Sequence, residues 1–208
     1  MPRALRILLS ALLLAGLASS ISAQFRLFGP RSPKPAPQPK MRSASAYISR
    51  QPPLKVNQSV LSQATSDNVH VRVSLPKQRA YLMVGEQIAA DSPISSGKVG
   101  HSTPSGHFSV LEKDPDHRSS IYGDFVDGSG RVVRAGISAK ADSAPSGTHY
   151  VGAPMRWFMR LTGEGVGMHV GILPGYPASH GCIRMSSDGA KLFYDIVRIG
   201  TKVDVGDY

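Results

Sequence analysis

The fold is decided by residues 69–90, which read VHVRVSLPKQRAYLMVGEQIAA. Apolar side chains alternate with polar ones over residues 69–75, and this period of two predicts a β-strand. A turn signal, PKQ, follows at residues 76–78, and a second strand is predicted at residues 79–84. A Gly-Glu turn then leads into a third strand at residues 87–90. This pattern predicts a β-meander at the start of a folded domain.

The sequence after this meander is also mostly of β character. A Gly- and Ser-rich loop follows it, and further strands are predicted at residues 107–111, 132–137, 155–161, 165–170 and 202–205. Residues 114–146, where only one short strand is evident, are interpreted as a functional loop or lid.

Only one helix is predicted. Ser186 or Ser187 can cap its N-terminus, apolar residues up to Val197 share one face, and Gly200 ends it. A mostly-β domain must close or cover its sheet edges. We therefore expect a β-sandwich or barrel with one main C-terminal helix.

The first 23 residues have the order of a secretory signal peptide. Arg3 and Arg6 form a basic head, residues 7–18 are almost entirely apolar, and small residues lead to Ala23. This order predicts export with cleavage after Ala23. The alternative is a permanent membrane anchor, which needs ~20 apolar residues and so a longer run than this one. After cleavage we expect no permanent membrane span.

Most of the net charge of +10 is carried by the N-terminal part of the chain. Residues 24–67 are rich in Pro, Ser, Gln and basic residues, which predicts a disordered spacer in which residues 56–64 could fold locally. From residue 68 onward there are 15 Lys and Arg against 13 Asp and Glu, so the predicted domain, 68–208, is close to neutral. This distribution, with no recognition motif, argues against a nucleic-acid partner. The spacer is either an extended linker or a segment that adheres to anionic envelope polymers.

The chain has a single cysteine, Cys182, which cannot form an internal disulfide. Inert packing is the ordinary role of one buried cysteine. The surrounding residues 168–185, MHVGILPGYPASHGCIRM, instead favour catalysis, because they combine the thiol with two imidazoles, a guanidinium and several glycines. A cysteine nucleophile needs a base or cation nearby and unobstructed backbone N–H groups for the oxyanion. His169 is the candidate base, and Gly181 leaves space for a carbonyl group to approach.

Two motifs resemble the L,D-transpeptidase catalytic domain family, also called YkuD-like. The first is S-H-G-C-I-R at residues 179–184, preceded by the strand-terminal His169, and the second is T-P-S-G-H-F at residues 103–108, similar to the family element T-P-x-G-x-F. The resemblance spans most of residues 69–205 and implies an L,D-transpeptidase-like fold and an enzyme that needs no metal or other cofactor. Two features depart from the family. Only residues 170–178 separate His169 from the first motif, and Arg184 stands where some members have Asn.

The resemblance also implies roles for individual residues. Cys182 matches the nucleophile, and His169 matches the histidine that takes and returns the proton, with a backbone carbonyl as the usual third element. The amides of Gly181 and Cys182 would help to form the oxyanion hole. His180 either orders the turn or acts as a second catalytic or thiolate-stabilising group, and Ser179 more often supports such a turn than reacts.

Three further side chains are candidates for substrate binding. Arg184 suits a substrate carboxylate, because its planar guanidinium forms bidentate contacts; the alternative is an internal ion pair. Trp157 and Tyr176 could line a peptide groove, although aromatic residues in strands more often belong to the core. No catalytic role is predicted for His101, His107, His117 or His149.

The reaction implied by the resemblance is peptidoglycan remodelling. Cys182 would attack the amide between diaminopimelate and the terminal D-alanine of a tetrapeptide stem, and would release D-alanine to leave a thioester. An amine of another stem peptide would then give a 3→3 cross-link, an envelope-protein amine would give an anchored protein, and water would make the chain an L,D-carboxypeptidase or endopeptidase. The sequence does not separate these acceptors.

Two alternatives are not enzymes. A zinc-binding module could use His169, His180 and Cys182, but a structural zinc site usually has four ligands. The other is a non-catalytic wall-binding domain that keeps the motif. The signal peptide and the family's substrate together predict a periplasmic location.

Overall fold

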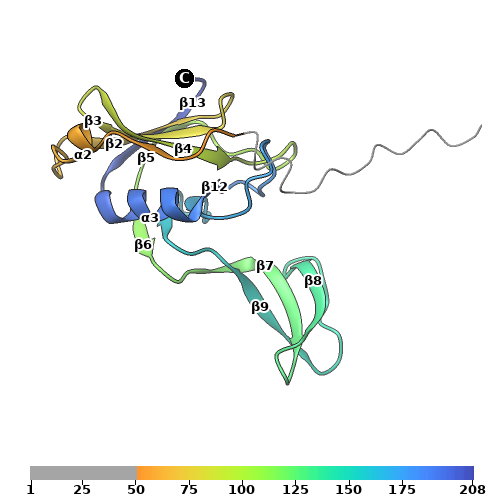
Figure 1. Cartoon of the computed structure of the whole chain (residues 1–208). Helices are drawn as coiled ribbons and strands as arrows, with labels where there is room; N and C mark the ends of the chain where they lie inside the picture. The colour runs from red at the N-terminus through yellow and green to blue at the C-terminus, as the bar shows by residue number, and fades with distance from the viewer. Residues whose placement is uncertain (1–50) are drawn as a thin grey trace, which may run out of the picture. The chain divides into compact units, whose positions relative to one another are not determined.

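The computed structural model describes residues 51–208. One half of its main sheet has the strand order β5-β13-β2-β3-β4 (Figure 1). The predicted meander is present as β2 (Val69–Ser74), β3 (Arg79–Val84) and β4 (Gln87–Ser95), all antiparallel. The last strand, β13 (Lys202–Gly206), pairs parallel with β2 and antiparallel with β5 (Gly106–Ser109).

The other half of the sheet continues from β4 in the order β12-β11-β10-β6. These strands are β12 (Ile183–Met185), β11 (Gly167–Val170), β10 (Phe158–Arg160) and β6 (Glu112–Asp114). All neighbours here are antiparallel except β11 and β12, which run parallel. This parallel pair carries the predicted catalytic residues.

The sheet curls so that its two end strands, β5 and β6, follow each other directly in the chain. The N–H of Val110 donates to Thr201 O at 3.0 Å, on the side of β13, and the N–H of Leu111 donates to Arg160 O at 2.8 Å, on the side of β10. The chain therefore passes from one half of the sheet to the other at these two residues, which protects both sheet edges. This curled, mostly-β architecture confirms the predicted fold class.

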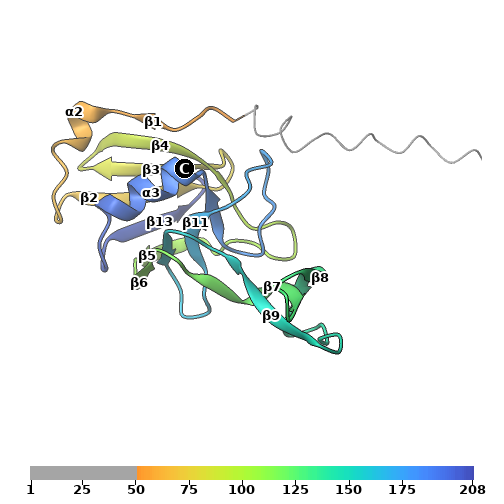
Figure 2. The ribbon, with the colours of Figure 1, turned by 60° about the horizontal axis from the view of Figure 1, so that its bottom comes forward.

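The single main helix, α3 (Ser187–Ile196), lies against the inside of the curled sheet (Figure 2). Ser186 is its N-cap, as predicted, and the Ser186 Oγ accepts from the N–H of Gly189 at 3.2 Å. The fully buried Phe193 and the strands share one hydrophobic core. The helix ends at Ile196 and not at Gly200, because Val197 already has extended backbone; Gly200 belongs to the turn into β13. Among residues 51–208, no helix is long and apolar enough to cross a membrane.

The last part of the predicted spacer is folded onto the domain. A short strand, β1 (Lys55–Val56), pairs with β4, and a one-turn helix, α2 (Gln58–Leu61), buries Val60 in the core. Arg79 also donates to Pro52 O at 2.7 Å. The folded region thus begins well before residue 68, while the predicted signal peptide and residues 24–50 lie outside the described residues.

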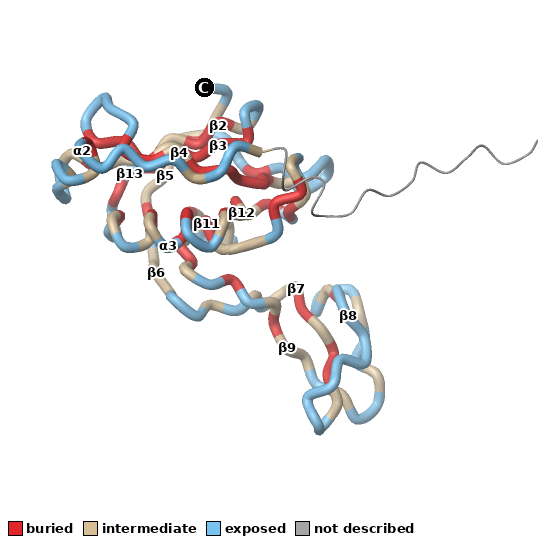
Figure 3. The backbone as a smooth tube through the Cα atoms, viewed as in Figure 1, coloured by how far each residue is buried: buried red, intermediate tan, exposed pale blue. Residues whose placement is uncertain are grey.

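A separate three-stranded sheet occupies the region interpreted as a loop or lid. Its strands are β7 (Arg118–Asp127), β8 (Val132–Ser138) and β9 (Thr148–Pro154), in the order β8-β7-β9. Most of β8 is exposed (Figure 3), and the few buried side chains of this sheet include Phe125 and Ile137. The region is therefore a small sheet with little core of its own and not an irregular loop.

Candidate active site

The parallel pair of β11 and β12 brings the predicted catalytic residues to one face of the sheet. Met168 pairs with Ile183, and both are fully buried in the core. Because side chains alternate along a strand, His169 and its register partner Arg184 face the opposite side, and so does Cys182, which immediately precedes β12. These three residues line a single cavity of about 830 Å³.

His169 is held in one tautomer by its own strand. Its side chain is only 7% exposed, and Nδ1 lies 2.7 Å from Val170 O. A carbonyl oxygen only accepts, so Nδ1 carries the proton and Nε2 keeps its lone pair. Burial lowers the pKa of His169 to about 4, and the positive charge of Arg184 adds to this effect against the hydrogen bond to Val170. His169 is therefore neutral near pH 7 and can accept a proton at Nε2.

Cys182 rests as a thiol. Burial raises the pKa of Cys182, although a backbone hydrogen bond from Gly167 and the positive charges of Arg184 and Arg160 oppose this rise. The Cys182 Sγ lies 3.7 Å from Gly165 O, which accepts the S–H. The cavity at rest thus contains a neutral thiol and a neutral imidazole.

Ser179 supports the turn that presents Cys182. Its side chain is buried, and its hydroxyl donates to Cys182 O while accepting from the N–H of Gly181 at 3.1 Å. Gly181 has a φ of 118°, which residues with side chains rarely adopt. The N–H of Gly181 is thus bonded within the turn in this structure, which fits the turn-supporting role predicted beside the oxyanion role.

The Gly-rich loop between β4 and β5 supports the same turn from the other side. The N–H of Ser179 donates to Ser96 O, and Ser179 O accepts from the N–H of Lys98, each at 3.0 Å. The hydroxyl of Thr103 accepts from the N–H of Gly97 and donates to Gly181 O, both at 2.8 Å. The T-P-S-G and S-H-G-C motifs, far apart in the sequence, therefore form one hydrogen-bonded unit.

The comparisons with known proteins agree with this arrangement. The profile of the L,D-transpeptidase catalytic domain, YkuD, matches residues 68–205. The chain belongs to this family. The L,D-transpeptidase from Mycobacterium smegmatis has a similar fold, with 22% identity and a TM-score of 0.50 over 66% of this chain and 58% of that one. The L,D-transpeptidase LdtMt1, solved in complex with imipenem, is 20% identical, with the same TM-score and coverage.

The similarity to these solved structures shows the fold alone, because fewer than a quarter of the aligned residues are identical. The chain also spans less than two thirds of the length of either structure. No curated protein matches the sequence.

Arg184 has no acidic partner in this L,D-transpeptidase domain. Among residues 51–208 no carboxylate lies within ion-pair distance of its guanidinium, whereas the other arginine of the cavity, Arg160, pairs with Glu112. A Cβ at Gly171 would lie only 2.7–2.9 Å from side-chain atoms of Arg184, so the arginine lies across this glycine. The cavity therefore contains a positive group that is free to bind an anionic ligand.

His180 joins the turn to the three-stranded sheet. Its exposed ring stacks on Tyr122 of β7 at a centroid distance of 4.4 Å and meets the edge of His101 at 4.9 Å. Partial burial and the charges of Lys98 and His101 lower the pKa of His180. This stacking places the sheet β8-β7-β9 beside the turn that carries Cys182, and residues of β7 and β9 form part of the cavity wall.

Two residues predicted to bind substrate lie elsewhere. Trp157 has a φ of 56° and packs beside Tyr194 of α3 at 5.2 Å, and it does not line the cavity. Tyr176 is 49% exposed and also lies outside the cavity; its backbone carbonyl accepts from the hydroxyl of Ser95 at 2.7 Å. Neither side chain therefore lines the cavity that contains Cys182.

The cavity residues that the sequence did not predict include His117 and Tyr122. His117 hydrogen-bonds through Nδ1 to Asp114 at 3.1 Å and stacks on Phe158 at 4.2 Å, and Tyr122 contacts the turn as described. Both lie in the segment interpreted as a loop, where isolated aromatic rings carry no periodic signal. They are recognised as cavity residues only because the folded structure places them near the motif that contains Cys182.

One group of metal-ligating side chains is present among residues 51–208, and it consists of Glu112, Asp114 and His117. Arg160 already pairs with Glu112, and His117 already bonds Asp114, so the acidic groups have partners. His169, His180 and Cys182, the residues of the zinc alternative, do not form such a group within this part of the chain.

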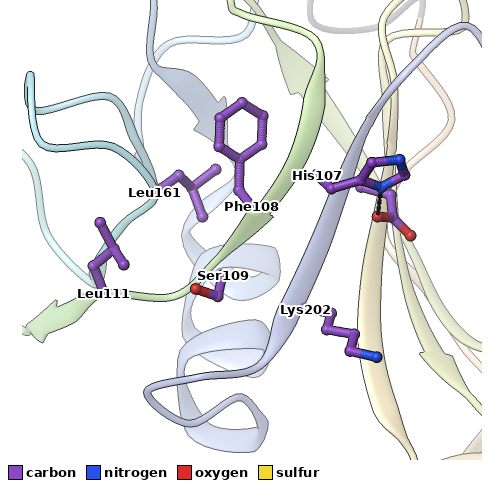
Figure 4. Close-up of a pocket in the computed structure, with 7 residues that line it drawn as sticks. His107, Phe108, Ser109, Leu111, Leu161 and Lys202 are labelled. Carbon is purple, nitrogen blue, oxygen red and sulfur yellow. Dashed lines mark hydrogen bonds and ion pairs between the residues drawn. The ribbon is translucent and has the colours of Figure 1, made fainter.

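A second, shallower hollow of about 650 Å³ lies at β5 and β13 (Figure 4). Phe108, Leu111 and Leu161 supply its apolar side, and His107 pairs with Asp204 at 2.7 Å. It contains no group positioned like those around Cys182.

Proposed function

We propose that this chain is an exported cysteine L,D-transpeptidase that acts on peptidoglycan stem peptides. The observation that carries the proposal is the placement of Cys182 and His169 on one face of neighbouring parallel strands, in one cavity, with His169 neutral and its Nε2 unprotonated. A thiol beside a neutral imidazole is the arrangement that nucleophilic acyl transfer requires.

The first half-reaction forms a thioester. His169 Nε2 takes the proton of the Cys182 thiol while the sulfur attacks the carbonyl carbon of the amide between diaminopimelate and D-alanine. The positive charges of Arg184 and Arg160 favour the developing thiolate. The N–H of Cys182 donates to the oxyanion, and His169 then returns its proton to the nitrogen of the departing D-alanine, so the C–N bond breaks as the C–S bond remains.

The second half-reaction transfers the acyl group. An acceptor amine attacks the thioester carbonyl, gives a proton to His169, and displaces the Cys182 sulfur, which recovers that proton as the thiol. A stem-peptide amine would give a 3→3 cross-link and an envelope-protein amine would give an anchored protein. Water in the same place would make the chain a hydrolase, an outcome that the test below distinguishes.

Arg184 is proposed to bind a substrate carboxylate. Its guanidinium reaches the cavity without an acidic partner among residues 51–208, and a stem peptide brings carboxylates close to the scissile bond. Export to the periplasm is proposed on the signal-peptide pattern of residues 1–23 and on the location of peptidoglycan.

The proposal is tested with the protein comprising residues 24–208 and a disaccharide-tetrapeptide, with products identified by mass spectrometry. We expect a dimer that lacks one D-alanine, and no product with Cys182→Ala or His169→Gln. His107→Gln, which changes an exposed histidine outside the cavity, serves as the matched control and should retain activity.

Imipenem provides an independent readout, because the relative LdtMt1 was solved in complex with it. A carbapenem amide should acylate Cys182 and add its mass to the protein. Loss of D-alanine without dimer would indicate the hydrolase. Intact tetrapeptide and an unmodified protein after exposure to imipenem would refute the proposal.

A further inference from the structure

The T-P-S-G motif contains a buried hydroxyl whose direction is fixed. Thr103 is only 6% exposed, and its Oγ1 accepts from the N–H of Gly97 at 2.8 Å. Its own proton is therefore directed to its other partner, Gly181 O, also at 2.8 Å. This bond joins residues that are 78 positions apart in the sequence.

The acceptor of this bond belongs to the peptide unit that matters most for catalysis. A peptide unit is planar, and the carbonyl of Gly181 shares its plane with the N–H of Cys182. Any group that fixes the direction of Gly181 O also fixes the direction of that N–H. Under the proposed function, on which this inference rests, the Cys182 N–H donates to the oxyanion.

Gly181 makes such a restraint necessary. It has a φ of 118°, and because it has no side chain, no side-chain packing restrains its backbone dihedral angles. Ser179 holds the peptide plane before Gly181 through the Gly181 N–H. Thr103 holds the plane after it, so the two hydroxyls together restrain both sides of this glycine.

We propose that Thr103 is a positioning residue, whose hydroxyl aligns the Gly181–Cys182 peptide so that the Cys182 N–H points at the developing oxyanion. The same hydrogen bond polarises the peptide and makes that N–H a stronger donor. Loss of one oxyanion donor typically lowers kcat by about 10²–10³. Because removal of the hydroxyl would misalign the donor without deleting it, we expect a decrease of about 10- to 100-fold in the acylation rate.

The test compares two reactions of the same sulfur. Acylation by imipenem develops an oxyanion, whereas alkylation of Cys182 by iodoacetamide does not. Thr103→Val removes the hydroxyl at nearly constant shape, Thr103→Ser keeps it, and Ser102→Ala alters the exposed neighbour as a matched control. Thr103→Ala is included as a second hydroxyl-free variant, in case the valine disturbs folding.

We expect Thr103→Val and Thr103→Ala to lose about 10- to 100-fold in the rate of acylation but less than about twofold in the rate of alkylation. Thr103→Ser and Ser102→Ala should remain close to wild type in both reactions. Wild-type acylation rates in the hydroxyl-free variants, or equal losses in both reactions, would overturn the positioning role while leaving the proposed function intact. A wild-type protein that iodoacetamide alkylates but neither imipenem nor tetrapeptide acylates would overturn the proposed function itself.

Discussion

Replacement of His169 with glutamine should remove part of the loss of stability that the protein shows when the pH is lowered. Burial lowers the pKa of His169 to about 4 in the folded protein, against an ordinary value of 6.5. Between these two pH values the unfolded chain binds a proton at this residue and the folded chain does not, so the free energy of unfolding falls as the pH falls. Each pKa unit corresponds to about 1.4 kcal/mol, which gives a total of about 3 kcal/mol. About 2 kcal/mol of this is already lost at pH 4.5.

The assay is urea unfolding of both proteins at pH 7 and at pH 4.5, followed by the fluorescence of Trp157, the single tryptophan. All other titrating groups are shared, so the difference between wild type and His169→Gln isolates this residue. We expect the wild type to lose about 2 kcal/mol more than the variant on acidification. Equal losses in both proteins would refute the depressed pKa and, with it, the argument that burial keeps this imidazole neutral.

Three further predictions concern the supporting residues. Gly171→Ala should displace Arg184, since the added Cβ would lie 2.7–2.9 Å from its side chain, and kcat/KM for tetrapeptide should fall about tenfold, as for Arg184→Gln; unchanged kinetics would contradict the proposed carboxylate contact. Trp157→Ala should lower Tm through lost packing, and the rate of acylation by imipenem should stay within about twofold of wild type, because the ring lies outside the cavity. A chain that begins at Asn68 should be less stable to urea than one that begins at Gln51 by about 2–4 kcal/mol, since it lacks β1 and α2; equal stability would show that these elements contribute nothing.

The sequence predicts well those parts of the fold in which apolar and polar residues alternate regularly or a capping residue marks the end of a helix. The strand at residues 79–84 has the predicted bounds, and Ser186 caps the helix as expected. The strands β7 and β9 were missed, because their pairing requires glycine where a strand signal would need a side chain. Gly123 and Gly152 are register partners, and a Cβ at Gly123 would lie 2.2 Å from Val151 O. Close backbone approach thus removes the pattern that would reveal these strands.

The candidate site also has one part that the sequence predicts and one part that only the structure shows. The prediction of Cys182 and His169 as catalytic residues comes from the motif, because it depends on residue type. The bond from Thr103 to Gly181 and the stacking of Tyr122 on His180 join segments distant in the sequence, and no local pattern encodes them. Such contacts follow only from the curl of the sheet and the position of the three-stranded sheet above the turn.

The connection between β11 and β12 limits how this domain can be altered. Parallel neighbours need a crossover of about a dozen residues, and here only residues 171–182 lie between Val170 and Ile183. The segment that delivers the nucleophile is therefore close to its shortest workable length. Deletions within it should disrupt the pairing of β11 with β12, whereas insertions ahead of Ser179 should be tolerated, because they leave His169 in β11 and Cys182 next to β12. Changes in the length of this segment are therefore expected to be insertions and not deletions.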